Sequence, residues 1–256
     1  MSVSAPRVLV VEHERETSLD RMSDLPGVDV RVVRPYAGEP LPDRSAADGP
    51  GWDGVLVLGG SMAAWEDAAA PWLPGVRTLL RSAVADGVPV LGICLGAQLL
   101  AMATGGEVRR GDAGPEVGVR PVVLGPDAAG DQLAARLSAV LAAPQGHRDA
   151  VTALPPGAVL LASSDRYPHQ LFRVGPRAWG VQYHPEVSRG VFATWLEEHR
   201  SDLALEGSTP QDELRLFDDR DAELQASARV HAAAFADVVR SHASTRTQAG
   251  AAAPAR

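Results

Sequence analysis

The sequence predicts an α/β fold with a doubly wound, mostly parallel central sheet that carries helices on both faces and added β-hairpins. Short apolar runs rich in Val and Leu recur through the first part of the chain, and an amphipathic stretch with helical spacing separates two of them. Beyond this part the strand-like runs are punctuated by Gly and Pro. Alternating strand and helix signals are typical of a parallel sheet, whereas closely spaced strands indicate hairpins.

Strands of the first half are expected where apolar residues run continuously, because the strands of a parallel sheet are buried on both faces. The runs cover residues 7–11, 28–33, 54–58 and 89–93. Between the last two runs a helix is predicted over 73–85, on the helical spacing of Val76, Leu79, Leu80 and Val84.

The second half is expected to add hairpins to the same sheet rather than to form a second domain. Strands are predicted over 119–124, 158–162, 170–174 and 178–183, and one helix is predicted over 131–142. Gly and Pro between these runs indicate the turns.

Two further helices are predicted near the end of the chain, over 189–205 and 218–241. The apolar stripe of the second helix fits packing on this domain or on a partner, so its role as a docking surface, a dimer contact or a lid on the core stays open. We expect a main domain over 1–205, a helical extension over 206–242 and a disordered tail over 243–256, where Ala, Gly and Pro dominate.

Charge and cysteine content exclude several classes of function. Lys+Arg total 24 and Asp+Glu total 32, and the resulting net charge of −8 argues against nucleic-acid binding, which needs a concentrated positive surface. The single cysteine, Cys94, cannot form an internal disulfide. No targeting segment or membrane-spanning apolar run is visible. These features predict a soluble cytoplasmic protein.

The sequence contains no lysine, which removes Schiff-base chemistry and the lysine of a phosphate-binding loop. An ATP-dependent step that relies on such a loop would fall to another protein. A metal site built from His147, His169, His184 and Asp149 is disfavoured because no metal-ligand spacing such as H-x-x-x-H occurs. We therefore expect neither a metal nor an organic cofactor.

Cys94 stands where a predicted strand runs into a predicted helix, and Gly92 and Gly96 flank it. This is the nucleophile-elbow pattern, in which the small flanking residues permit a sharp, strained turn. A thiol at a helix N-terminus is stabilised as the reactive thiolate. A buried structural cysteine is the alternative, and the elbow favours the nucleophile.

A histidine and a glutamate lie two residues apart after the last predicted strand. If this segment is extended, His184 and Glu186 project to one face. A carboxylate that orients a histidine general base is the arrangement that a cysteine nucleophile uses, although a surface His-x-Glu pair is the alternative.

Gly60 follows the strand predicted over 54–58, at the edge of the sheet where Cys94 also lies. The backbone N–H groups of Gly60 and Leu95 are therefore the expected oxyanion hole. A simple Gly-Gly turn is the alternative.

These motifs together resemble class I, or triad, glutamine amidotransferases, and the likeness extends from Val8 to Leu203. The Gly-x-Cys-x-Gly-x-Gln motif at Cys94 and the later Tyr-His-Pro-Glu motif at His184 carry the resemblance. It is closest to stand-alone members similar to the glutaminase domain of GMP synthase. The resemblance implies a flavodoxin-like fold and a triad of Cys94, His184 and Glu186.

The resemblance implies that this triad hydrolyses the side-chain amide of L-glutamine to glutamate and ammonia through a cysteine thioester. The resemblance also implies that Gln98, His147 and Asp149 bind the substrate. A carboxylate such as that of Asp149 suits the ammonium group of glutamine. Two departures are notable, since Arg148 replaces a glycine often found between the histidine and the aspartate, and Val119 replaces an aromatic residue after Glu116. Glu116 is either a specificity residue or a solvent-facing glutamate.

Three functions follow as alternatives. The first is a glutaminase that supplies ammonia to a separate synthetase. The second is a hydrolase of another γ-glutamyl amide or peptide, and the third is a silent regulatory module on the same fold. Retention of Cys94, His184, Glu186 and Gln98 argues against the third. The partner, a synthetase or a second copy of the chain, is left open.

Overall fold

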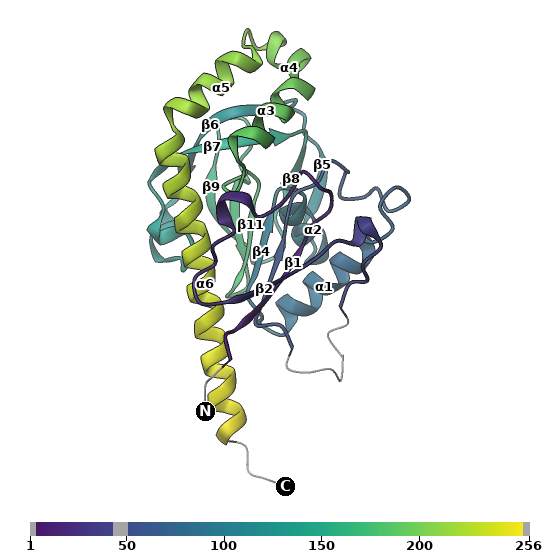
Figure 1. The fold of residues 1–256 in the computed structure, drawn as a ribbon, viewed down its shortest axis with the longest axis vertical. Helices are drawn as coiled ribbons and strands as arrows, with labels where there is room; N and C mark the ends of the chain where they lie inside the picture. The colour runs from purple at the N-terminus through teal and green to yellow at the C-terminus, as the bar shows by residue number, and fades with distance from the viewer. Residues whose placement is uncertain (1–3, 43–50, 253–256) are drawn as a thin grey trace.

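The computed structural model describes residues 4–42 and 51–252 of the chain, with side chains up to 248. A mixed sheet runs through its centre (Figure 1). In spatial order its strands are β2 (Asp29–Val33), β1 (Arg7–Val11), β3 (Gly54–Val57), β4 (Val90–Ile93), β11 (Ala178–Val181), β10 (Leu171–Val174), β9 (Val159–Ser163), β6 (Glu116–Leu124) and β7 (Val140–His147).

The sheet has a parallel part and an antiparallel part. From β2 to β11 each strand pairs in parallel with its neighbour, and from β11 to β7 all pairings are antiparallel. The doubly wound sheet with hairpins added to one side is therefore confirmed. A separate two-stranded sheet of β5 (Glu107–Arg110) and β8 (Asp149–Ala153), which the sequence analysis did not predict, lies beside it.

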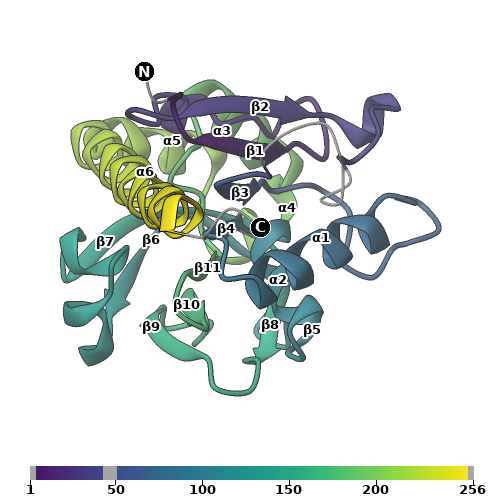
Figure 2. The same cartoon turned by 90° about the horizontal axis from the view of Figure 1, so that it is seen from below.

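Helices cover both faces of the sheet (Figure 2). The helices α1 (Leu73–Ala85) and α2 (Leu95–Ala103) pack on one face, and the long helix α6 (Asp221–Ala252) crosses the other. Strand β1 shows why both faces need cover, because Val8 and Val10 join the core under α6 while Leu9 and Val11 join the core under α1 and α2. Three shorter helices, α3 (Arg189–Glu198), α4 (Arg200–Leu205) and α5 (Pro210–Asp219), lie at one end of the molecule (Figure 1).

The prediction of a helix over residues 131–142 is wrong. The chain instead makes a short 3₁₀ turn, Ala134–Arg136, and then enters strand β7 at Val140. The carboxylate of Asp131 caps the start of this turn, because it accepts the backbone N–H groups of Leu133 and Ala134, each at 2.9 Å, and the turn ends where the backbone becomes extended at Leu137. The same carboxylate oxygen of Asp131 also accepts a hydrogen bond from the indole N–H of Trp179 at 2.9 Å, so the turn is fixed to the core. Residues from Val140 onward then pair with β6.

The C-terminal region also differs from the sequence-based expectation. Helix α5 was not predicted, and α6 continues to Ala252, through most of the segment expected to be disordered. Arg246 on its last turns pairs with Asp53 at 2.5 Å, which fastens this part of the helix to the sheet domain. Residues 253–256 of the expected tail lie outside the described residues. Among the described residues no helix has the length and apolar character needed to cross a membrane.

Helix α6 is held to the sheet by a fully buried hydrogen-bonded pair. His231 donates through Nδ1 to the carbonyl oxygen of Ser227 at 2.8 Å, so its Nε2 accepts from the hydroxyl of Tyr183 at 2.9 Å. Burial lowers the pKa of His231 to about 4, and it raises the pKa of Tyr183. Both groups are therefore neutral at physiological pH. Since Tyr183 precedes His184, this pair also fixes the backbone that carries the candidate catalytic histidine.

The neutral state of His231 predicts a loss of stability in acid. The unfolded chain binds a proton near the ordinary pKa of 6.5, whereas folded His231 does so only at about 4. The contribution of His231 to the free energy of unfolding is up to about 3 kcal/mol. It is complete above pH 6.5 and is lost as the pH falls toward 4. Burial lowers the pKa of His13 to about 4 as well, so that residue adds to the same loss.

We expect His231→Gln to be less stable than the wild type at neutral pH and to have a shallower loss of stability between pH 6.5 and 4. Chemical denaturation across this range measures both effects. His169→Gln, at a partly buried histidine, is the matched control and should keep the wild-type slope. An unchanged slope in His231→Gln would contradict the buried neutral assignment.

Candidate active site

Cys94 lies at a strained turn between strand β4 and helix α2. Its φ of 49° is in the region that residues other than glycine rarely adopt. The flanking glycines are required by close backbone contacts. A Cβ at Gly92 would lie 2.4 Å from the carbonyl oxygen of Gly96, and one at Gly96 would lie 2.1 Å from the carbonyl oxygen of Val57. The sequence-predicted elbow is therefore present as a geometric feature.

His184 is brought to Cys94 by the parallel pairing of β4 with β11. The register places Val181 beside Ile93, and the backbone N–H of Cys94 donates to the carbonyl oxygen of Val181 at 2.7 Å. The next turn of chain is fixed from the other side, since the backbone N–H of His184 donates to Pro144 at 2.9 Å. The two side chains thus meet at the carboxyl ends of adjacent strands.

Glu186 holds the imidazole of His184 from behind. The distance from His184 Nδ1 to Glu186 Oε1 is 2.7 Å, and both side chains are buried. Burial alone would lower the pKa of His184, but the carboxylate of Glu186 and the sulfur of Cys94, which also hydrogen-bonds the ring, raise it to about 10. These two contacts therefore favour the protonated form of His184, which donates its Nδ1–H to Glu186.

Gln182 is a further contact of Cys94 that the sequence reasoning missed. Its Nε2 donates to Cys94 Sγ at 3.6 Å, and its Oε1 accepts from Gln98 Nε2 at 3.3 Å. Gln98 Nε2 also donates to the backbone carbonyl of Asp149 at 3.0 Å. The sequence signal that could have revealed Gln182 is its spacing of two residues from His184, which is in turn two residues from Glu186. This spacing puts all three side chains on one face of an extended segment, and all three are buried.

Gly60 lines the same pocket as Cys94, and Leu95 is the first residue of α2. The N–H of such a residue has no acceptor within its own helix. Side chains pack tightly around Gly60, since a Cβ there would lie 2.7 Å from Met62 Sδ and 2.9 Å from Leu95 Cδ2. Both expected oxyanion-hole residues are therefore close to Cys94.

His147 and Asp149 stand at the junction of β7 and β8. Both ring nitrogens of His147 already face oxygen atoms, at 3.0 Å from the carbonyl oxygen of Asp149 and at 3.1 Å from Glu116 Oε2. Glu116 is buried and also accepts from Gln170 and Ser164, so it is neither solvent-facing nor in the pocket wall. The carboxylate of Asp149 pairs with Arg110 at 2.8 Å.

Arg148 does not fill the space between His147 and Asp149, because its side chain leads away to helix α4. Its guanidinium pairs with Asp202 at 2.5 Å and remains about half exposed at the edge of the pocket. The substitution of arginine for glycine thus adds a cation to the rim of the site.

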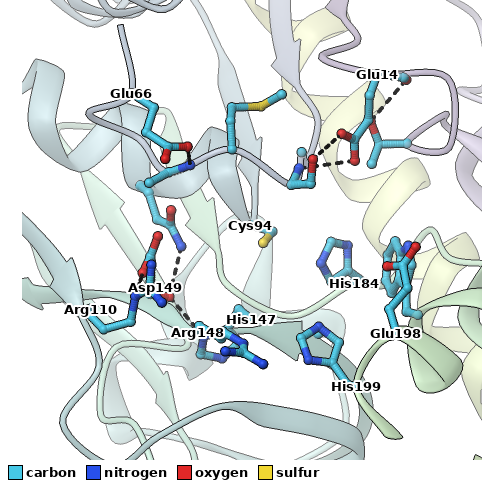
Figure 3. A pocket seen from close by; sticks show the side chains of 18 residues that line it. Glu14, Glu66, Cys94, Arg110, His147, Arg148, Asp149, His184, Glu198 and His199 are labelled. Carbon is cyan, nitrogen blue, oxygen red and sulfur yellow. Dashed lines mark hydrogen bonds and ion pairs between the residues drawn. The ribbon is translucent and has the colours of Figure 1, made fainter. Parts of the chain in front are cut away.

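The residues described above surround one cavity of about 300 Å³. Figure 3 shows Cys94 near its centre, with His184 on one side and Asp149 and Arg110 on the other. Six of the sequence-predicted residues line it, while Glu186 lies behind His184 and Leu95 behind Cys94. Those six are Gly60, Cys94, Gln98, His147, Asp149 and His184. In the described part of the chain, no three His, Cys, Asp or Glu residues are grouped so that they could hold a metal ion.

Comparison with known proteins identifies the family. The family model described as "Glutamine amidotransferase class-I" matches residues 16–200. The chain is 32% identical over 142 residues to gamma-glutamyl peptidase 5 of Arabidopsis thaliana, covering 55% of this chain and 56% of that protein. It is 36% identical over 101 residues to a glutamine-hydrolyzing GMP synthase of Porphyromonas gingivalis, covering 39% of this chain and 19% of that protein.

The chain therefore spans 56% of the length of the peptidase and 19% of the length of the GMP synthase. Among solved structures, a glutamine amidotransferase from Thermotoga maritima has a TM-score of 0.77 and 27% identity, over 92% of this chain and 98% of that one. The order of the motifs, the sheet that positions them and the extent of the family match agree. This chain belongs to the class I glutamine amidotransferase family.

Proposed function

We propose that the protein hydrolyses the γ-amide of L-glutamine to glutamate and ammonia, with Cys94 as the nucleophile. The arrangement of Cys94 and His184 in one cavity, with Glu186 behind the histidine, carries this proposal. A thiol at a strained helix N-terminus, a buried histidine beside it and a carboxylate behind that histidine form the set that acyl transfer requires.

In the first step, the thiolate of Cys94 attacks the amide carbon, and the C–S bond forms as the carbonyl oxygen gains negative charge. The N–H groups of Gly60 and Leu95 stabilise that oxygen. The proton held by His184 moves to the amide nitrogen, the C–N bond breaks, and ammonia leaves. The γ-glutamyl group then remains on the sulfur as a thioester.

In the second step, water attacks the thioester. His184, now neutral, takes a proton from the water as its oxygen bonds to carbon, and the C–S bond breaks to release glutamate. Glu186 keeps the ring in place through both steps and stabilises the imidazolium that forms again. Each cycle therefore consumes one water and restores the starting charge state.

The amino-acid end of the substrate fits the side of the cavity opposite His184. Asp149 supplies a carboxylate for the substrate ammonium, and Arg110 supplies a cation for the substrate carboxylate. Gln98 holds this wall through its bond to the Asp149 backbone. In this assignment His147 positions the wall, because both of its nitrogens are already engaged.

Hydrolysis of a larger γ-glutamyl amide or peptide is the second candidate. The cavity continues past His184 along helix α3, through Trp195, Glu198 and His199, and the relatives include proteins named gamma-glutamyl peptidases. In the first candidate the ammonia passes to a separate synthetase, as the glutamine-hydrolyzing GMP synthases among the relatives suggest. The absence of lysine leaves any step that needs a lysine-bearing phosphate loop to that partner.

The nucleophile assignment predicts the effect of Cys94→Ala. Release of glutamate and ammonia from glutamine should fall by at least about 10³-fold, because no other group can form the thioester. Coupled assays of both products measure this. Labelling by a glutamine-like electrophile should also disappear, and it reports on one site because Cys94 is the only cysteine and the chain has no lysine.

Melting temperature of Cys94→Ala serves as the control for folding and should match the wild type within a few degrees. Hydrolysis that persists in Cys94→Ala would reject the nucleophile. A wild-type protein that is neither labelled nor active with any γ-glutamyl amide, even with a synthetase present, would reject the enzyme assignment.

The contact between Gln182 and the sulfur predicts a second effect. Gln182→Leu removes a donor to the thiolate, and a hydrogen bond to a charged group contributes about 1.5–3 kcal/mol. We therefore expect alkylation of Cys94 by iodoacetamide and hydrolysis of glutamine to slow by about 10- to 100-fold at neutral pH. Gln211→Leu, at an exposed position of α5, is the matched control. Wild-type alkylation by folded Gln182→Leu would show that the contact is passive.

A further inference from the structure

One wall of the cavity lies beyond His184 and comes from helix α3. Trp195, Glu198 and His199 line it, with Trp195 and Glu198 three residues apart on α3 and His199 at the residue where this helix ends. Figure 3 shows Glu198 and His199 on the His184 side of Cys94, away from Asp149 and Arg110. The cavity therefore has a second region that the amino-acid end of the substrate does not occupy.

Trp195 attaches this wall to the catalytic histidine. Its ring packs edge-on against the His184 ring, with centroids 4.5 Å apart and planes at 60°. Trp195 also lies against the backbone of Gly146, where a Cβ would be 3.1 Å from its Cε3 atom. Since His184 gives its proton to the departing nitrogen, the group attached to that nitrogen must lie on this side of the cavity.

The carboxylate of Asp202 holds two side chains in place at the rim of the same wall. Its carboxylate contacts Arg148 at 2.5 Å and His199 Nδ1 at 2.9 Å. Burial alone would raise the pKa of Asp202, but the hydrogen bonds and charges of His199 and Arg148 lower it, so the carboxylate is ionised. Asp202 uses one terminal nitrogen of the guanidinium, which leaves other N–H groups of Arg148 at the cavity edge.

Ammonia has a single heavy atom, so as a leaving group it is too small to contact this wall. We propose that the wall is a leaving-group subsite, and that the substrate is a γ-glutamyl amide whose nitrogen belongs to an amino acid or a peptide. The carboxylate of that leaving group binds Arg148, and its side chain lies against Trp195. The inference rests on the proposed cysteine hydrolase and selects the second of its two candidate functions, so glutamine is expected to be the poorer substrate.

Arg148 is suited to a carboxylate because its planar fork can form two parallel hydrogen bonds to it. Glu198, the one acid on the α3 face, is exposed, so solvent and salt screen its repulsion of that carboxylate. The bond changes are those of glutamine hydrolysis. The C–S bond forms, the C–N bond breaks, the His184 proton goes to the nitrogen, and an amino acid leaves in place of ammonia.

The test compares kcat/KM for γ-glutamylalanine with that for γ-glutamylethylamide, which has a substituted nitrogen but no carboxylate. The wild type should prefer γ-glutamylalanine over both the ethylamide and glutamine. Arg148→Met should lower the alanine-to-ethylamide ratio by about 10-fold or more, because a hydrogen-bonded ion pair is lost. Because the ratio is measured within one variant, a general loss of folded protein does not change it.

Arg200→Met is the matched control. Arg200 is an exposed arginine of α4 that pairs with Glu197 and does not line the cavity. It should leave the ratio unchanged, and Arg148→Lys should restore part of it. An equal loss for both substrates in Arg148→Met would mean that Arg148 binds the glutamyl carboxylate and would overturn the inference, as would a wild-type preference for glutamine or for a γ-glutamyl diamine.

The outcomes also separate this inference from the proposed function. Hydrolysis of glutamine or the ethylamide with an unchanged ratio would overturn the subsite and leave the cysteine hydrolase in place. No hydrolysis of any of these compounds, with no labelling of Cys94, would overturn both.

Discussion

The parallel pairing of β4 with β11 is the constraint on which the rest of the site depends. These strands are far apart in the sequence, yet their register puts Val181 beside Ile93, so the segments that follow both strands begin at the same edge. One segment turns into helix α2 through the strained Cys94, and the other carries Gln182, His184 and Glu186. Cys94 and His184 are thus positioned by backbone hydrogen bonds of the central sheet, which are among the least mobile parts of a fold.

Burial makes this arrangement electrostatically strong. Glu186 and His184 are almost completely removed from water, so their interaction is screened far less than a surface pair would be. Such a pair loses hydration, and the surrounding structure has to hold its geometry closely. The hydrogen bond between Tyr183 and His231 helps to hold this geometry, because it joins the segment that carries His184 to helix α6. Of the roles left open for this helix, the structure thus supports packing on its own core.

The sequence predicted the parts of this molecule that depend on local patterns. Apolar runs located the parallel strands, and the glycines around Cys94 located the elbow, because steric requirements there are visible in single residues. It could not locate β7 or β8, because these strands form by pairing with β6 and β5, and the pairing of β7 overrides the helical spacing of residues 131–142. The contact of Gln182 with sulfur and the displacement of Arg148 toward Asp202 depend on tertiary packing, so no local motif could reveal them.

We propose that Cys94, activated by His184, carries the γ-glutamyl group during turnover. Rapid acid quenching of the protein during reaction with a γ-glutamyl amide, followed by peptide mass analysis, tests it directly. We expect one γ-glutamyl adduct on the peptide that contains Cys94, sensitive to hydroxylamine as a thioester is. Turnover with no adduct on Cys94, even when the hydrolysis step is slowed, or an adduct on another residue, would contradict it.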